Sequence, residues 1–127
     1  RTVKAKHRPI VIITSNAEKE LPDAFLRRCI FHYIDFPDEK LMEEIVRVHY
    51  PDVEEHLLAS AMEVFYRIRD LRDIRKKPST SELIDWINAL QLGGIPANTI
   101  KSALPFIGVV VKKDEDLETV RHNANQF

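Results

Sequence analysis

The stretch VEEHLLASAMEVFYRIRDL, residues 53–71, gives the chain its helical character. Apolar residues recur in it at intervals of three and four positions: Val53, Leu57, Leu58, Ala61, Val64, Phe65, Ile68 and Leu71. Because an α-helix completes a turn in about 3.6 residues, this spacing places the apolar side chains on one face of a helix. Such a face is stable only when it packs on other elements. We therefore expect a long helix within a helical bundle.

Helices are predicted on both sides of this stretch. Residues 39–49 place apolar side chains mostly along one helical face. The sequence STSELIDWINAL, residues 79–90, opens with the pattern of a capping box, Ser79 to Glu82, and stops before Gly93. Two shorter helices are expected at about residues 97–104 and within residues 112–127.

The segment PIVIITSNAEKELPDAFLRRCIFHYIDFP, residues 9–37, follows a different pattern. Residues 10–14 are β-branched without polar alternation, which is typical of a strand buried on both faces of a parallel sheet. Residues 21–28 predict a short helix, and residues 30–36 predict a second strand. The predicted fold is mainly α: a helical bundle preceded by a two-strand remnant of an α/β sheet.

Composition limits the size of the fold and its partners. The 127 residues, 44% of them hydrophobic, can bury one modest core. Nineteen basic and twenty acidic side chains leave a formal net charge of -1, which excludes a global positive field for nucleic acid or anionic lipid. The single cysteine rules out an internal disulfide, and no apolar run approaches the roughly 20 residues that span a bilayer. We expect a cytoplasmic chain without membrane insertion.

Three residues carry the chemistry that the segment 9–37 could perform. Asn16 follows the first predicted strand, at the strand end where ligands bind in open α/β sheets. Its carboxamide could hold a water molecule and a phosphate oxygen together; the alternative is an Asx-type turn that leaves the strand. Arg27 and Arg28 close the predicted helix, where a guanidinium could reach a phosphate across a subunit boundary or stabilise the helix C-terminus.

In this order, the residues resemble a known family. The sequence VIITSNAEKELPDAFLRRC, residues 11–29, is similar to the segment of AAA+ ATPases that runs from the sensor 1 strand to the arginine finger. The likeness is to the MoxR-like branch and covers about residues 9–90. It implies that Asn16 positions the attacking water and that Arg28, with Arg27 as the second candidate, acts on ATP in a neighbouring subunit. It also implies that the helices form a lid over the nucleotide, preceded by a remnant of a P-loop type sheet.

The sequence departs from the family pattern at the start of the third lid helix. The family usually has a sensor 2 arginine there, in a pattern like Ser-Pro-Arg, whereas Ser81 occupies that position in this sequence. Lys76 or Lys77, in the preceding turn, could replace the arginine; the alternative is that both lysines are solvated loop charges. Ser81, Lys76 and Lys77 are the candidate nucleotide contacts of the lid.

Two features that an ATPase needs are missing from the sequence. None of Gly93, Gly94 and Gly108 is followed by Lys and then Ser or Thr, as a phosphate loop requires, and Asp35 is a lone carboxylate rather than a magnesium motif. The resemblance then implies a C-terminal fragment that neither binds nor hydrolyses ATP. Its parent would be a ring that uses ATP and Mg²⁺ to remodel an unidentified protein client. The expected parts are a sheet remnant at 1–37, a lid at 38–111, and a short helix and tail at 112–127.

Two alternatives from other functional classes remain open. The sequence RIRDLRDIRKK, residues 67–77, could form a helical nucleic-acid-binding module. Helical spacing spreads its charges, however, and Asp70 and Asp73 could pair with them, so a nucleic-acid partner is not expected. The chain could also be a non-enzymatic protein-interaction bundle in which Asn16 and Arg28 have no catalytic role. No metal site is expected, because the histidines and the single cysteine lack the spacing of a zinc site.

Overall fold

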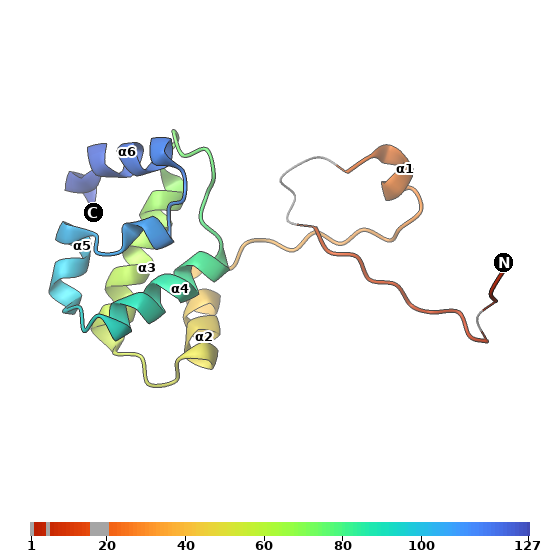
Figure 1. Ribbon diagram of the computed structural model, residues 1–127, viewed down its shortest axis with the longest axis horizontal. Helices are drawn as coiled ribbons and strands as arrows, with labels where there is room; N and C mark the ends of the chain where they lie inside the picture. The colour runs from red at the N-terminus through yellow and green to blue at the C-terminus, as the bar shows by residue number, and fades with distance from the viewer. Residues whose placement is uncertain (1, 5, 16–20) are drawn as a thin grey trace. The chain divides into compact units, whose positions relative to one another are not determined.

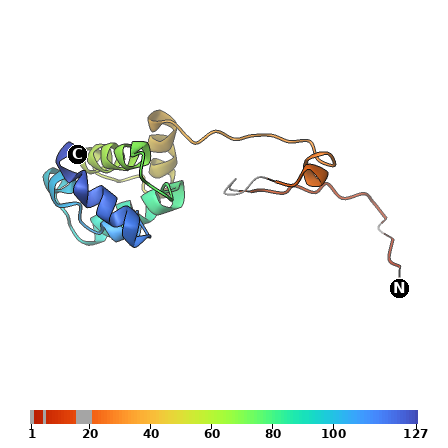
Figure 2. The same cartoon turned by 90° about the horizontal axis from the view of Figure 1, so that it is seen from above.

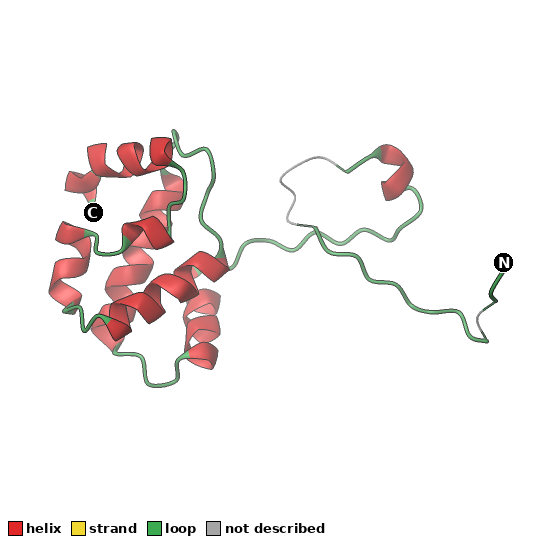
Figure 3. Cartoon of the chain, viewed as in Figure 1, coloured by secondary structure: helices red, strands yellow, loops and turns green. Residues whose placement is uncertain are grey.

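The computed structural model describes residues 2–4, 6–15 and 21–127. The chain divides into two compact units, Arg1–Asp35 and Phe36–Phe127. Throughout the described ranges the regular structure is helical and no residue belongs to a strand (Figure 3). The prediction of a mainly α chain is therefore confirmed.

The described residues of the unit Arg1–Asp35 form one short helix, α1 (Asp23–Leu26). Pro22 precedes it with a φ of -58°, the value that suits the start of a helix. The helix expected at residues 21–28 thus forms only in its centre.

The two predicted strands of this part of the chain are absent. Residues 10–14 and 30–36 have no strand pairing, and Ile10 and Ile30 are 92% and 102% exposed. An extended segment becomes a strand only when a neighbour pairs with its N–H and C=O groups, and the described residues supply no such ladder. The predicted two-strand sheet remnant is therefore wrong for the part of the chain that the structure describes.

The unit Phe36–Phe127 is a helical bundle in which α3 contacts α4, α5 and η1, and α2 contacts α4 (Figure 1, Figure 2). Its elements, with η for a 3₁₀ helix, are α2 (Glu39–His49), α3 (Glu55–Asp70), α4 (Thr80–Leu92), η1 (Ala97–Thr99), α5 (Ile100–Ala103), η2 (Ile107–Val109), α6 (Asp114–His122) and η3 (Ala124–Gln126). The bounds of α2 match the prediction, and those of α3 and α4 differ from it by at most two residues. The helical periodicity of the sequence was sufficient to locate these three helices.

The core of this unit gathers the apolar faces that the sequence predicts. Met42 of α2, Phe65 and Ile68 of α3, and Trp86 of α4 have no exposed surface. The indole N–H of Trp86 donates to the Pro105 carbonyl at 2.7 Å, so the polar atom of this buried ring is satisfied. Burying a side chain such as Met42, Phe65 or Ile68 stabilises a fold by roughly 1.5–3 kcal/mol. The core therefore holds α4 firmly, and α4 carries the candidate lid residue Ser81 in its first turn.

The chain turns sharply after α4. Gly93 caps the helix, as predicted, and Gly94 has a φ of 60°. Leu104 and Phe106 also have positive φ, 47° and 57°, which costs a non-glycine residue about 1 kcal/mol. No glycine marks these two positions in the sequence, so they were not predicted.

Candidate functional site: the basic turn before α4

Residues 75–78, RKKP, lead into α4, and we call them the basic turn. The side chains of Arg75, Lys76 and Lys77 are exposed, whereas Pro78 is buried. Among the described residues, ion pairs involve Arg75 but neither Lys76 nor Lys77. The two ammonium groups are thus the charges of this turn that meet solvent without an ion-pair partner.

A buried carboxylate from α6 anchors the start of the basic turn. Asp116 is 1% exposed; its Oδ1 accepts the N–H of Arg75 at 2.8 Å and its Oδ2 accepts the N–H of Lys76 at 3.1 Å. Burying a charge is costly unless it is hydrogen-bonded, and here each carboxylate oxygen has a donor. Glu115 adds an ion pair to Arg75 at 2.8 Å, but the two side chains are 64% and 68% exposed, so this pair contributes little.

An arginine from α3 anchors the end of the basic turn. The Nη1 of Arg69 donates to the Pro78 carbonyl at 2.5 Å, and its guanidinium carbon lies 3.4 Å from the centroid of the Phe36 ring. Phe36 stacks on Phe65 of the core, with ring centroids 6.1 Å apart. Burial lowers the pKa of the Arg69 guanidinium, which nevertheless stays protonated in proteins. Residues of two other helices therefore hold the basic turn at both ends.

The first turn of α4 continues directly from the basic turn. Ser81 is exposed there. The predicted capping box is confirmed: the N–H of Ser79 donates to Oε2 of Glu82 at 2.6 Å, and the Ser79 hydroxyl donates to the same oxygen. Burial raises the pKa of the Glu82 carboxyl, but the hydrogen bonds from Ser79 outweigh burial and lower that pKa, with a smaller contribution from Lys76. The hydrogen bonds from Ser79 are therefore the main interactions that keep Glu82 ionised at the start of α4.

The other predicted site residues belong to the unit Arg1–Asp35. Asn16 lies outside the described residues. Arg27 is the C-terminal cap of α1, and the N–H of Arg28 donates to the Phe25 carbonyl at 3.2 Å. Both arginine side chains are exposed. Because α1 has only four residues, its macrodipole is small and gives little reason for two arginines at its end.

Three of the six basic side chains of residues 67–77 that could have contacted nucleic acid bind within the protein instead. Arg67 pairs with Glu63 at 2.6 Å, and two further arginines of this segment make the contacts at the basic turn. The expected ion pairs through Asp70 and Asp73 are absent from the described part of the chain; glutamates of α3 and α6 supply the partners. The three engaged arginines therefore contact different parts of the fold, which leaves the exposed side chains of Arg72, Lys76 and Lys77 outside these contacts.

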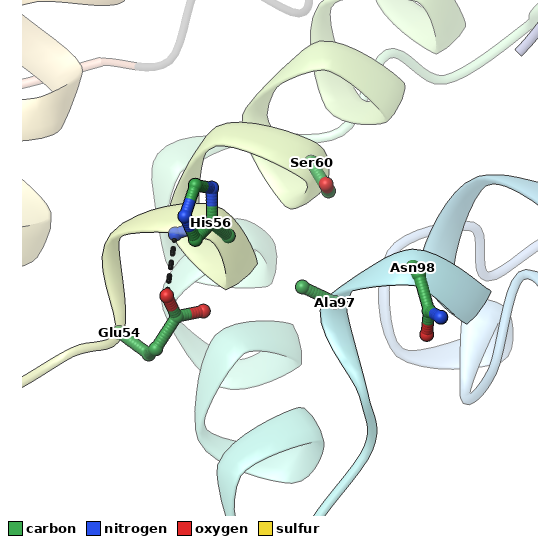
Figure 4. Close-up of a pocket in the computed structure, with 5 residues that line it drawn as sticks. All are labelled: Glu54, His56, Ser60, Ala97 and Asn98. Carbon is green, nitrogen blue, oxygen red and sulfur yellow. Dashed lines mark hydrogen bonds between the residues drawn. The ribbon is translucent and has the colours of Figure 1, made fainter.

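An open surface hollow lies between the start of α3 and η1 (Figure 4). It is lined by Glu54, His56, Ser60, Ala97 and Asn98. The Glu54 carboxylate accepts N–H bonds from the first turn of α3, one of them from His56 at 2.9 Å, and these bonds lower the pKa of Glu54. Because this carboxylate occupies N–H groups at the helix start, it competes there with any anionic ligand. No motif in the sequence marks the hollow.

Sequence reasoning missed both anchors of the basic turn. Asp116 stands in the acidic run of residues 114–116, and the one signal for its burial is its four-residue spacing from Val120, which is fully buried. Arg69 stands in a basic stretch in which no pattern distinguishes it from its neighbours. Both assignments required the folded arrangement.

Comparison of the chain with models of protein families, with curated proteins and with solved structures found no match. Within residues 2–4, 6–15 and 21–127, no helix combines the length and the apolar character needed to cross a bilayer. In the same ranges, no group of three or more His, Cys, Asp or Glu side chains is arranged to hold a metal ion. The residues and their arrangement are therefore the basis for a functional assignment.

Proposed function

We propose that the chain is the C-terminal part of an AAA+ ATPase of the MoxR-like branch, which couples ATP binding and hydrolysis to the remodelling of a protein partner. One observation carries the proposal: a segment with TSN followed by LPDAFLRRC leads into a separate helical unit that begins at Phe36. In an ATPase of this kind the first part would bear residues that act on the nucleotide, and the second part would be the lid.

Each candidate residue has a defined role in this proposal. Asn16 orients the attacking water. Arg28, with Arg27 as the second candidate, supplies positive charge to ATP bound by a neighbouring subunit. Lys76 and Lys77 supply positive charge to the phosphates from the lid. These roles suit phosphoryl transfer, in which catalysis consists almost entirely of positioning and electrostatic stabilisation.

The chain supplies only part of a nucleotide site. It contains no phosphate loop, so the main contacts to ATP and Mg²⁺ would come from the parent protein. The exposed arginines of residues 27–28 and the exposed lysines of the basic turn fit the phosphate chain of ATP, because cations of both kinds bind phosphate oxygens. Bound Mg²⁺ would neutralise charge on those oxygens. We expect no ATP hydrolysis by this chain alone.

A protein-interaction bundle without enzymatic activity is the second candidate function. It is favoured by the apolar side chains of the first unit, where Ile10, Ile12, Ile30 and Ile34 are exposed by 80% or more. Binding of nucleic acid is not proposed, because Arg67, Arg69 and Arg75, three of the six basic side chains of residues 67–77, are engaged within the protein. The two candidates differ in whether the complete protein needs Arg28 to hydrolyse ATP.

ATP hydrolysis by the complete protein that contains this chain tests the proposal. Arg28→Ala should lower kcat by about 10³-fold or more, as expected for an arginine that stabilises the transition state in trans. Asn16→Ala should also lower kcat, because the attacking water loses its partner. Arg72→Ala, which removes an exposed arginine of the helical unit, should leave kcat unchanged.

Mixed assemblies reveal whether Arg28 acts across a subunit boundary. An Arg28→Ala subunit should abolish ATP hydrolysis at the site of its neighbour. As the fraction of Arg28→Ala subunits rises, the ATPase activity of the mixtures should therefore fall faster than expected for independent subunits. Unchanged hydrolysis in both Arg28→Ala and Asn16→Ala, or a complete protein without ATP hydrolysis, would overturn the proposal in favour of the interaction bundle.

A further inference from the structure

The basic turn is fixed by residues that are distant from it in the sequence. Asp116 holds the N–H groups of Arg75 and Lys76, and Arg69 holds the carbonyl of Pro78. These bonds act on the backbone of the turn, from which the side chains of Lys76 and Lys77 extend into solvent. The buried side chains of Ile74 and Pro78 already attach this segment to the helical unit.

The anchor at the start of the basic turn is a carboxylate, that of Asp116, rather than an apolar side chain. A buried charge is weak evidence for stability, because a well-packed apolar residue of similar volume often serves as well or better. Unlike an apolar side chain, the carboxylate of Asp116 makes directional contacts, because its two oxygens accept hydrogen bonds from two consecutive backbone N–H groups. The backbone from which Lys76 and Lys77 extend is thereby held in one conformation.

We propose that Asp116 is a positioning residue, which holds the basic turn in the conformation in which Lys76 and Lys77 meet the phosphates of the nucleotide. The inference rests on the proposed function, and it explains how the lid supplies cationic charge although Ser81 stands where the family has arginine. In this arrangement α6 belongs to the lid site without touching the nucleotide. Arg69 completes the arrangement by fixing the other end of the turn.

Amide hydrogen exchange in the chain itself tests the structural half of the inference. Asp116→Asn removes the charge at nearly constant size, and Asp114→Asn makes the same change at an exposed position in the same turn of α6. In Asp116→Asn the amides of Arg75 and Lys76 should exchange about tenfold to a hundredfold faster, as expected when a hydrogen bond to a charged acceptor is lost. The interior amides of α4 should keep their rates, and Asp114→Asn should change none. The inference would be overturned if Asp116→Asn increased the exchange rates of all amides equally, or if it changed no exchange rate.

Kinetics of the complete protein test the functional half. Asp116→Asn should raise the KM for ATP about tenfold with little change in kcat, because the lysines bind phosphates already in the ground state. Asp114→Asn should change neither constant. In a background that carries Lys76→Ala and Lys77→Ala, Asp116→Asn should have no further effect, because its influence passes through these lysines. An equal rise in KM with and without the lysines would overturn the positioning role.

The outcomes separate this inference from the proposed function. Loss of hydrolysis in Arg28→Ala together with a normal KM in Asp116→Asn would overturn the inference and leave the proposed function standing. Hydrolysis that does not depend on Arg28 or Asn16 would overturn the proposed function and the inference with it, even where the amides of the basic turn respond to Asp116→Asn.

Discussion

The guanidinium carbon of Arg69 lies 3.4 Å from the centroid of the Phe36 ring, where the chain enters the helical unit. Beside this contact, the Tyr66 hydroxyl donates to the Pro37 carbonyl at 2.7 Å. Burial raises the pKa of that hydroxyl, so it remains a donor at neutral pH. Through these residues α3 fixes the entry of the chain and, through the bond from Arg69 to Pro78, the end of the basic turn.

Arg69→Lys should lower the free energy of unfolding by about 1–2 kcal/mol. A lysine has no planar guanidinium that can stack on Phe36 and reach the Pro78 carbonyl at the same time. Urea unfolding, followed by the fluorescence of the buried Trp86, measures the change. Arg72→Lys, at an exposed position nearby, should change the same quantity by less than about 0.5 kcal/mol. Equal effects of the two substitutions would show that the contacts of Arg69 contribute nothing to stability.

Ser79→Ala should destabilise the helical unit by about 1 kcal/mol, because it removes one side of the capping box at the start of α4. Ser81→Ala is the matched control: Ser81 is exposed, as Ser79 is, and lies in the first turn of α4, but it takes no part in the cap. Its effect on the free energy of unfolding should stay within about 0.5 kcal/mol. Thermal unfolding of both variants measures the two costs. If Ser79→Ala and Ser81→Ala lower the free energy of unfolding equally, the capping box does not stabilise the protein.

Gly93→Ala should destabilise the protein by about 1 kcal/mol through crowding. A Cβ at this position would lie 3.0 Å from Cε2 of Phe106 and 3.2 Å from the carbonyl oxygen of Ala89. In a Phe106→Ala background the cost should shrink, because the ring that it meets is gone. Gly94→Ala should cost about as much in both backgrounds, since its penalty comes from a φ of 60° and not from a neighbouring atom. A double-mutant cycle of unfolding free energies checks this, and a Gly93→Ala cost that does not depend on Phe106 would contradict the crowding.

Glu63 provides a pH-dependent contribution to stability. It accepts a hydrogen bond from Lys101 and pairs with Arg67 at 2.6 Å. The hydrogen bond from Lys101 is the main cause that holds the pKa of Glu63 below its ordinary value of 4.5. The folded protein therefore releases this proton more readily than the unfolded chain does. The contribution is fully present above about pH 4.5 and is lost as the pH falls through the lowered pKa.

Glu63→Gln should accordingly cost about 0.5 kcal/mol of unfolding free energy at neutral pH, a small value because the Glu63 side chain is 37% exposed and screened by solvent. The difference from the unsubstituted protein should disappear in acid, below the lowered pKa. Urea unfolding across a pH series measures it. In a Lys101→Ala background most of the difference should be lost at every pH. A difference that stays constant from neutral to acidic solution would contradict the assignment.

The helices could be predicted from the sequence because apolar spacing and capping residues lie within the helical segment itself. Residues 39–49 became α2 without change, and the capping box at Ser79 marks the start of α4. The sequence also placed Ser81 in the turn that follows Lys76 and Lys77. Their nucleotide contacts, and the roles of Arg27 and Arg28, stay predictions, and Asn16 lies outside the described residues.

The predicted strands failed for a physical reason. The β-branched composition of residues 10–14 expresses a preference for extended backbone, but pairing depends on a second segment that no local pattern can guarantee. The expected ion pairs through Asp70 and Asp73 failed similarly, because arginines on α3 have several carboxylates within reach and packing selects among them. In the folded protein, Arg67 forms its ion pair with Glu63.

The amino-acid order alone established which segments of this protein are helical, which faces they bury and where several of them end. An α-helix closes its hydrogen bonds within one segment, so spacing and end residues carry that information. The folded arrangement was needed to show that Asp116, and not its acidic neighbour Asp114, is buried behind the basic turn, and that Arg69 bridges Phe36 and Pro78. Side chains of one chemical type are equivalent along the sequence, and only the packing of distant segments decides which of them meets a partner.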